Sequence, residues 1–348
     1  MFYDVLIVGA GPAGSSTAMV IAQQGRKVLI VDRKRVIGEP VRCAEFVPRL
    51  LAGEVSISKD CIANEVESMI THFPDGESYK ILSPGFILNR ALFDRTMIIE
   101  ALRAGAELWI DTRFVRFSHG KALVVRGGEL VEVAAKVVVG ADGPVSSVGK
   151  MIGETNKDFV FGLEYQIPLM KNMSDTQVYF SRDFFGGYAW LFPKERYANV
   201  GVGIKLKRNC YLRLKNLLDQ FIKKLKKEEK IIGSPVSLIS GLIPVGGPLK
   251  TVKENILLVG DAAGQTHPIT GAGIAQAIIC GKIAGEAIVQ AVKSDNIKKL
   301  LEYEKNWQKL YYSELKRATE KRHFLERNWG KLNEVLKRCW VVFPEYYG

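Results

Sequence analysis

The 348-residue sequence predicts an α/β fold with three parts: a parallel sheet flanked by helices, an interleaved antiparallel sheet, and a set of C-terminal helices. Three apolar runs that each end in a glycine motif predict the parallel strands. Alternating patterns between residues 158 and 204 predict the antiparallel strands. Amphipathic helical patterns fill much of the chain after residue 210. A chain of this length exceeds the usual size of one hydrophobic core, so we expect more than one domain.

The first glycine motif lies close to the N-terminus. An apolar strand at 5–8 precedes it, a helix at 15–24 follows, and a second strand at 27–31 ends at Asp32, with Arg33 next to it. The glycines would let a pyrophosphate approach the helix N-terminus, and Asp32 suits the ribose hydroxyls of a dinucleotide. This pattern predicts a Rossmann-type dinucleotide-binding domain. The fingerprint residues are Gly9, Gly11, Pro12, Ala13 and Gly14.

Two further glycine motifs follow apolar strands. One strand at 136–140 leads into a D-G turn, and another at 256–259 leads into Gly260-Asp261. A carboxylate in this position can accept hydrogen bonds from polyol hydroxyls. After Gly271, the helix that begins near Gly273 and Ile274 offers backbone N–H groups to the edge of a ring.

In this order the three motifs resemble those of the para-hydroxybenzoate hydroxylase-like flavoproteins. The resemblance implies that the cofactor is FAD and that the chain has the fold of that superfamily, with a Rossmann-type FAD-binding domain. The contacts that it implies are Asp32 at the adenosine ribose, Asp261 near the ribityl chain, Gly273 and Ile274 beside the isoalloxazine ring, Arg90 at the pyrophosphate, and the backbone of Val115 at the adenine.

Two shorter segments resemble the geranylgeranyl reductase family. Residues 37–46 are similar to its R-C-G-E-G segment beside the flavin, and residues 187–193 are similar to its Y-x-W-x-F-P signature. Arg42, Cys43 and Ala44 are therefore expected at the cofactor. The sequence departs from the family pattern because Ala44 and Phe46 replace two glycines and Ala272 replaces a glutamate. If this segment lines the substrate pocket, Phe46 is expected to narrow or reshape it.

The aromatic signature predicts one wall of a pocket. Tyr188, Trp190 and Phe192 alternate along a strand and thus face the same side, where they form either a pocket for an apolar chain or an ordinary core. Cys43 either donates a proton during alkene reduction or packs as a small buried residue. We also expect Glu45 to pair with Arg42 or to meet the ring edge. His267 either touches the flavin or is only hydrogen bonded.

The resemblance implies an FAD-dependent reductase that saturates isolated C=C bonds of a geranylgeranyl-type isoprenoid lipid. An aromatic hydroxylase of the same fold is the alternative, followed by a flavin-dependent halogenase and a lipid-binding flavoprotein without turnover. The electron donor is either NAD(P)H or a reduced carrier protein, since the sequence has neither a second dinucleotide motif nor an iron–sulfur ligand set. No metal site is expected from the five scattered cysteines.

The net charge of +12 comes from two segments. Residues 205–230 hold ten basic and three acidic residues, and residues 296–340 hold twelve and six, so the rest of the chain is close to neutral. These lysines and arginines form either solvated faces or a docking surface for anionic lipid headgroups. No nucleic-acid-binding module surrounds them, which argues against a nucleic-acid partner. We expect a cytoplasmic protein, peripheral at the membrane, without a signal peptide or a transmembrane helix.

The motifs also predict domain boundaries. The FAD-binding domain is expected to be discontinuous and to comprise residues 1–45, 86–150 and 250–292. Residues 46–85 and 151–249 are assigned to the substrate domain with the antiparallel sheet, and residues 293–348 to the C-terminal helical segment.

Overall fold

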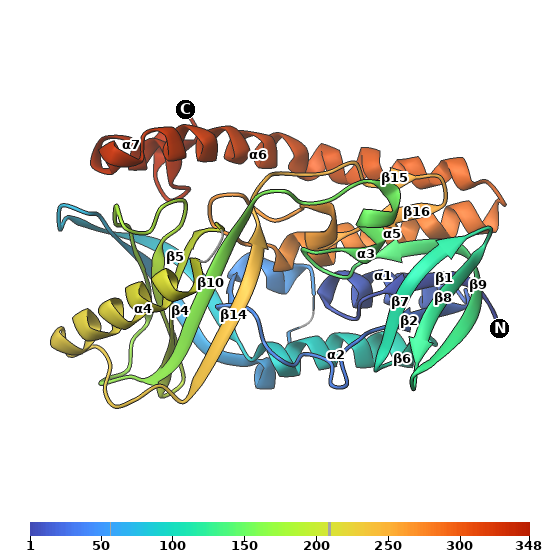
Figure 1. Ribbon diagram of the computed structural model, residues 1–348, viewed down its shortest axis with the longest axis horizontal. Helices are drawn as coiled ribbons and strands as arrows, with labels where there is room; N and C mark the ends of the chain where they lie inside the picture. Colours follow the sequence, from blue (N-terminus) through green and yellow to red (C-terminus); the bar gives the residue numbers. More distant parts are fainter. Residues whose placement is uncertain (56, 208–209) are drawn as a thin grey trace.

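The computed structural model describes residues 1–348 except residue 56 and residues 208–209. Arg208, which belongs to the first basic segment, therefore lies outside the described residues. Two eight-stranded sheets lie end to end along the long axis of the molecule, and one long helix runs over both (Figure 1). The amino terminus lies at the far end of the first sheet.

The first sheet has a parallel core in the order β16-β9-β1-β2-β6, with β15 antiparallel at one edge. Its central strand β1 is an almost continuous apolar run, as expected for a strand covered on both faces. Strands β7 and β8 continue from β9 as an antiparallel meander. The bounds are β1 Phe2–Val8, β2 Val28–Val31, β6 Glu107–Trp109, β7 Thr112–Ser118, β8 Lys121–Arg126, β9 Glu129–Gly140, β15 Val252–Lys253 and β16 Ile256–Leu258.

Helices cover one face of this sheet and the meander covers the other. Val5 and Ile7 of β1 point into a core formed with α1, α2 and α5. Leu6 and Val8 point into a second core formed with β7, β8 and α3. The alternation follows from the two-residue period of a strand. The helices are α1 Pro12–Gln23, α2 Arg90–Arg103, α3 Ser147–Ile152 and α5 Ile274–Lys293.

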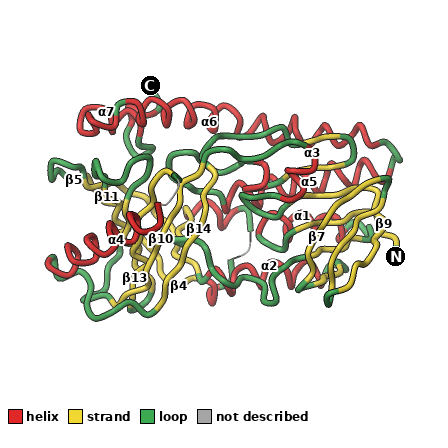
Figure 2. Tube along the Cα trace, viewed as in Figure 1, coloured by secondary structure: helices red, strands yellow, loops and turns green. Residues whose placement is uncertain are grey.

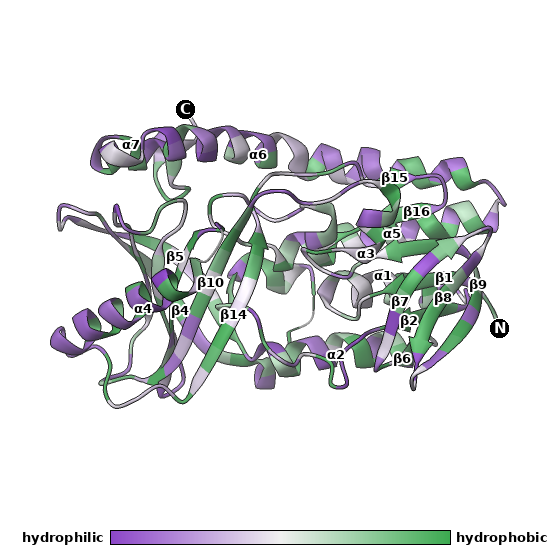
Figure 3. Cartoon of the chain, in the orientation of Figure 1, coloured by the Kyte–Doolittle hydropathy of each residue, from purple (hydrophilic) through white to green (hydrophobic). Residues whose placement is uncertain are grey.

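The second sheet has the order β14-β10-β13-β12-β11-β4-β5-β3. Its pairings are antiparallel except for β11 with β4, which is parallel, a detail that the sequence did not predict. Helix α4 (Cys210–Lys227) covers one face, and its outward side is strongly polar (Figure 3). The strands are β3 Phe46–Pro48, β4 Ile62–His72, β5 Ser78–Leu88, β10 Phe159–Pro168, β11 Asp175–Tyr179, β12 Ala189–Lys194, β13 Tyr197–Lys205 and β14 Ser237–Pro244.

Helix α6 (Leu301–Arg327) joins the two halves, and α7 (Leu332–Cys339) follows it over the second sheet (Figure 2). With 27 residues, α6 is about 40 Å long at a rise of about 1.5 Å per residue. Its first turns bury Tyr303 and Trp307 against the α1–α5 core, and its last turns bury Leu325 against the second sheet. Short 3₁₀ helices lie at Arg49–Gly53, Lys59–Cys61, Gly260–Ala263, Ile297–Leu300, Trp329–Lys331 and Pro344–Tyr346.

The predicted fold class is confirmed, and most predicted elements are present with small shifts of their ends. Tyr188, expected inside a strand, immediately precedes β12. The proposed domain boundaries stay a prediction. Among the described residues, α5 is the one helix with the length and composition to span a membrane, but more than half of its apolar window is buried inside the protein.

Candidate active site

The first glycine turn leaves the start of α1 open. Gly11 is the N-cap and provides no side-chain cap, and a Cβ built on it would meet nothing within 4 Å. The first N–H groups of α1 are therefore not satisfied by a capping side chain. Gly9 has φ 107°, and a Cβ on Gly14 would collide with the carbonyl oxygen of Gly9. Both glycines are required by this tight turn, which fits a bound pyrophosphate.

Asp32 holds the same turn from the end of β2. Its carboxylate accepts hydrogen bonds from the backbone N–H groups of Ala10 and Lys34, each at 2.8 Å. A carboxylate has about four acceptor positions, so others remain for ribose hydroxyls. Arg33 is exposed beside it. Their assignment to the cofactor stays a prediction.

A second open helix start lies at α5. Gly273 is its N-cap without a side-chain cap, and Gly271 precedes it with φ 71°. Asp261 lies nearby and accepts a hydrogen bond from Thr266 Oγ1 at 2.7 Å. Burial raises the pKa of Asp261 above its ordinary value. With Ile274 as the first residue of α5, this loop supplies the donors and the acceptor expected around the flavin end of FAD.

The remaining predicted cofactor contacts differ in their surroundings. Arg90 is held by Asp94 through two hydrogen bonds, Nε to Oδ1 at 3.1 Å and Nη2 to Oδ2 at 3.2 Å. Its remaining N–H groups must make any pyrophosphate contact. Val115 lies on β7 at a register shift between Phe114 and Arg116, where the regular pairing with β8 is interrupted. Its backbone groups are thus suited to a ligand. Both roles stay predictions.

Cys43 lies in a sharply bent segment beside Arg90. Its Sγ accepts a hydrogen bond from the backbone N–H of Glu45 at 3.2 Å, and Glu45 has φ 71°. Burial raises the pKa of the Cys43 thiol, with Arg90 and the Glu45 N–H acting in the opposite direction. The thiol is therefore protonated at neutral pH.

Glu45 is fully buried and forms an ion pair with Lys194, a partner that the sequence analysis did not predict. Its Oε2 lies 2.5 Å from Lys194 Nζ and 2.8 Å from Asn199 Nδ2, and its Oε1 accepts the N–H of Arg90 at 3.0 Å. The expected pair with Arg42 is wrong, because Arg42 is exposed and its Cβ lies close to Gly241 of β14. The Glu45–Lys194 pair joins the Cys43 segment to the second sheet.

The aromatic signature lies on the sheet face opposite α4. Trp190 and Phe192 are buried, and Phe46 packs near Phe192 with ring centroids 6.0 Å apart. The hydroxyl of Tyr188 donates to the carbonyl oxygen of Thr270 at 2.5 Å, within the loop that carries Gly271 and Gly273. The face is thereby joined to the loop of residues 264–273, which we call the flavin loop because it is expected at the flavin. Ala44 also packs against this cluster.

The indole ring of Trp190 packs against the backbone of Gly162, Gly201 and Gly203 on the neighbouring strands. Trp190 pairs with Gly201 across β12 and β13, and a Cβ on Gly201 would clash with its indole ring. The indole Nε1 donates to Glu164 Oε2 at 2.7 Å. Burial raises the pKa of Glu164 well above its ordinary value, and the nearby Glu45 adds to this. A charged residue within the apolar strand β10 was the signal available in the sequence.

The C-terminal residues cover the aromatic face. Trp340 contacts Tyr188 with centroids 5.4 Å apart and donates through Nε1 to Thr71 Oγ1 at 3.0 Å. Phe343 and Tyr346 are also buried. These rings pack against Trp190 and Phe192 in one hydrophobic cluster, so the C-terminal segment covers this face of the sheet.

His267 joins the flavin loop to this tail. Its Nδ1 accepts the N–H groups of Ile269 and Thr270 at 3.3 and 3.2 Å, and Nε2 lies 3.4 Å from the hydroxyl of Tyr346. Burial, together with Arg317, lowers the pKa of His267 to about 4. The ring is therefore neutral, and in this structure it positions the loop through hydrogen bonds.

Comparisons with known proteins identify the family. The geranylgeranyl reductase catalytic domain matches residues 163–242, an FAD binding domain matches residues 2–49, and a lycopene cyclase protein family matches residues 211–331. The digeranylgeranylglycerophospholipid reductase of Methanothrix thermoacetophila is 35% identical, over 93% of this chain and 88% of the relative. The chain belongs to the geranylgeranyl reductase family.

Other members of the geranylgeranyl reductase family give the same result. The corresponding reductase of Methanococcus aeolicus is 32% identical over 96% of this chain and 90% of its own. The crystal structure of a geranylgeranyl bacteriochlorophyll reductase-like protein from Thermoplasma acidophilum superposes with a TM-score of 0.86 at 31% identity, covering 98% of this chain and 92% of that one. This geranylgeranyl reductase family member is an FAD-dependent oxidoreductase, and the two open helix starts described above fit that cofactor.

Proposed function

We propose that the protein saturates isolated C=C bonds in the geranylgeranyl chains of a membrane lipid or its precursor. The observation that carries this proposal is the hydrogen bond from Tyr188 to Thr270, which joins the aromatic face to the flavin loop. An apolar chain lying on that face would be held against the cofactor. The family relatives named as digeranylgeranylglycerophospholipid reductases support this assignment.

The residues of the site would position the alkene and exclude water from it. Reduced FAD supplies the hydride. An isolated alkene is a poor hydride acceptor, so close positioning in a dry pocket is needed. Tyr188, Trp190, Phe192 and Phe46 would hold the chain, while Trp340 covers them from the C-terminal side.

Cys43 is proposed as the proton donor to the second alkene carbon. Its thiol is protonated at neutral pH and lies in the segment that resembles the R-C-G-E-G sequence beside the flavin. Replacement Cys43→Ala should lower turnover by at least tenfold with unchanged FAD content, because general acid catalysis contributes about 10²–10⁴-fold. Unchanged turnover would leave Cys43 with a packing role only.

The proposed activity is tested by anaerobic incubation of the dithionite-reduced protein with a geranylgeranyl glycerophospholipid. Mass spectrometry should find products that are heavier by two hydrogens for each bond reduced, together with reoxidised flavin. A flavin that stays reduced in the presence of the lipid would contradict the proposal. The alternative hydroxylase would instead consume O₂ and add an oxygen atom, and the comparisons do not favour it.

Two partners are proposed in addition to the lipid. The electron donor is NAD(P)H or a reduced carrier protein, and anaerobic mixing of the oxidised protein with NADH, NADPH or a reduced carrier tests which of them bleaches the flavin. An anionic membrane surface is the second partner, with the exposed lysines at the end of α4 as the contact. Vesicle binding should weaken with salt and with Lys→Glu changes at Lys223, Lys224, Lys226 and Lys227.

A further inference from the structure

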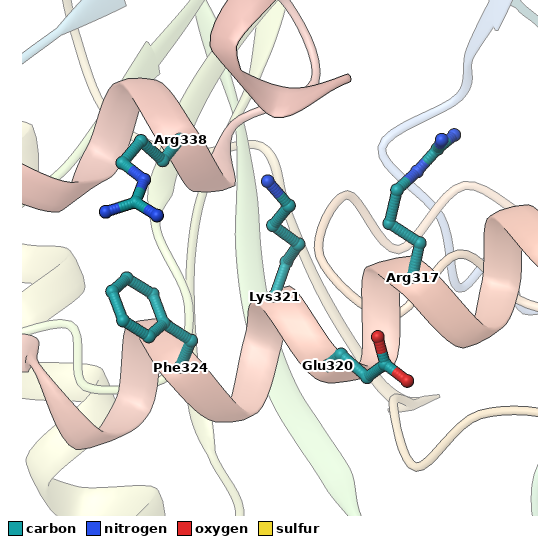
Figure 4. Close-up of a pocket in the computed structure, with 5 residues that line it drawn as sticks. All are labelled: Arg317, Glu320, Lys321, Phe324 and Arg338. Carbon is teal, nitrogen blue, oxygen red and sulfur yellow. The ribbon is translucent and has the colours of Figure 1, made fainter. Parts of the chain in front are cut away.

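A pocket of about 200 Å³ lies between α6 and α7, on the surface of the C-terminal segment (Figure 4). In this view Lys321 extends from α6 toward α7, which carries Arg338, and the ring of Phe324 lies below the Arg338 guanidinium. The Arg317 guanidinium lies on the other side of Lys321 from Arg338. The carboxylate of Glu320 points away from the tips of both cations. The residues that line the pocket are Arg317, Glu320, Lys321, Phe324 and Arg338.

The three cations of this pocket have no anionic partner. Arg317 and Lys321 are half-buried and Arg338 is exposed. Among the described residues, no carboxylate oxygen lies within 4.0 Å of any of the three, although most partly buried cations outside this pocket are paired. The Nε of Arg317 is buried without a hydrogen-bond partner. Like charges gathered in a small volume repel one another, and an anion between them removes this cost.

Aromatic rings orient the cations but leave their donors available. The Arg317 guanidinium and the Lys321 ammonium lie 5.5 and 5.4 Å from the ring of Tyr346, and the Arg338 guanidinium lies 5.4 Å from the ring of Phe324. A cation–π contact engages the face of a guanidinium, whereas its N–H groups lie in its plane. The pocket thus contains two guanidinium groups and one ammonium group, which are well suited to binding a phosphate.

The apolar wall of the pocket packs against the same hydrophobic cluster as the aromatic face. Phe324 packs against the cluster that contains Trp190 and Trp340. Arg338 precedes Trp340 by two residues at the end of α7, and Trp340 contacts Tyr188. A molecule with a phosphate at the cations would therefore have its apolar part next to Phe324, at the edge of this cluster.

We propose that this pocket binds the phosphate headgroup of the isoprenoid lipid substrate. The identity of the lipid rests on the function proposed above, whereas the phosphate chemistry rests on the pocket itself. Arg317, Lys321 and Arg338 neutralise the phosphate at the surface. The chains pass Phe324 and Trp340 to reach Tyr188 and Trp190.

The test compares two double variants of the FAD-loaded protein that lose the same charge. Lys321→Gln with Arg338→Gln empties the pocket of two cations. Lys309→Gln with Lys316→Gln removes two exposed lysines of α6 that do not line it. Titration calorimetry in detergent measures binding of three probes: a digeranylgeranyl glycerol phosphate, the same diether glycerol without phosphate, and glycerol phosphate alone.

The pocket variant should bind the phosphate-bearing lipid about tenfold more weakly for each cation removed. It should bind the phosphate-free lipid normally, and the control variant should bind both normally. Equal binding of the phosphate lipid by both variants would overturn the proposal, as would an equal loss for the two lipids. Glycerol phosphate that binds as tightly as the lipid would indicate a site for a soluble phosphate ester and would also overturn it.

Turnover separates this proposal from the reductase activity. If the pocket variant binds the phosphate lipid weakly and neither protein reduces it, the headgroup site stands and the proposed activity fails. If the wild type reduces the lipid and the pocket variant has the same KM, the activity stands and the headgroup site fails. A raised KM with unchanged kcat supports both.

Discussion

The indole nitrogen of Trp190 donates a hydrogen bond to Oε2 of Glu164, and the other carboxyl oxygen of Glu164 is buried without a partner among the described residues. The two side chains come from β12 and β10, which lie on either side of β13. An ionised carboxylate buried in this way would be costly, and burial accordingly raises the pKa of Glu164 well above its ordinary value, which favours the neutral acid as the acceptor of the Trp190 hydrogen bond.

Substitutions of Glu164 should separate its charge from its hydrogen bond. Glu164→Gln keeps a neutral acceptor of the same shape, so we expect little change in the free energy of unfolding. Glu164→Ala leaves the buried indole N–H unsatisfied and should cost about 1–3 kcal/mol. Urea unfolding monitored by fluorescence measures both. An equal loss in the two variants would mean that the carboxylate is ionised.

Two glycines beneath Trp190 should respond differently to an added methyl group. Gly201→Ala places a Cβ 2.2 Å from Cζ2 of the indole ring and should cost about 1–3 kcal/mol through overpacking. Gly162→Ala places it at 3.5 Å, an ordinary contact, and serves as the matched control. Thermal unfolding of both variants measures the difference. Equal stability of the two variants would show that the indole ring can move away from the added methyl group.

The Lys194–Glu45 pair should be fragile when one partner is removed. Lys194→Met leaves the Glu45 carboxylate buried without its cation and should cost about 3–5 kcal/mol. A second change, Glu45→Gln, removes the uncompensated charge and should recover part of this loss. Chemical unfolding of the single and double variants measures the coupling. A single variant as stable as the wild type would show that the pair is not held in the folded protein.

His267 should make the protein less stable as the pH falls. Its pKa is about 4 in the folded state and about 6.5 in the unfolded chain, so the unfolded chain binds more protons between these values. The stability is complete above about pH 6.5 and decreases toward pH 4, by roughly 3 kcal/mol for this group.

The control for this pH dependence is His267→Asn, whose side-chain oxygen can replace Nδ1 as an acceptor without titrating. Its free energy of unfolding should therefore vary less between pH 7 and pH 5 than that of the wild type. Identical pH profiles in the two proteins would assign the acid sensitivity to other groups. Urea unfolding at both pH values provides the comparison.

Local patterns predicted the fold well because each cofactor motif combines a strand, a glycine turn and a helix within a short stretch of chain. Asp32, Asp261 and Gly273 were assigned to the cofactor in this way, and these assignments stay predictions. The partners of Glu45 were missed because Lys194 and Asn199 lie about 150 residues away, on strands whose register no local pattern determines. Lys194 in particular belongs to a segment that reads as an ordinary polar hairpin connection.

The long helix α6 has a mechanical consequence. Tyr303 and Trp307 anchor it among the cofactor-side helices, while Arg322 near its other end donates to the carbonyl oxygens of Pro268 and Gly186. Rotation of one sheet against the other would have to bend this helix or withdraw a buried tryptophan. Helix α6 therefore braces the two halves of the molecule against such a rotation.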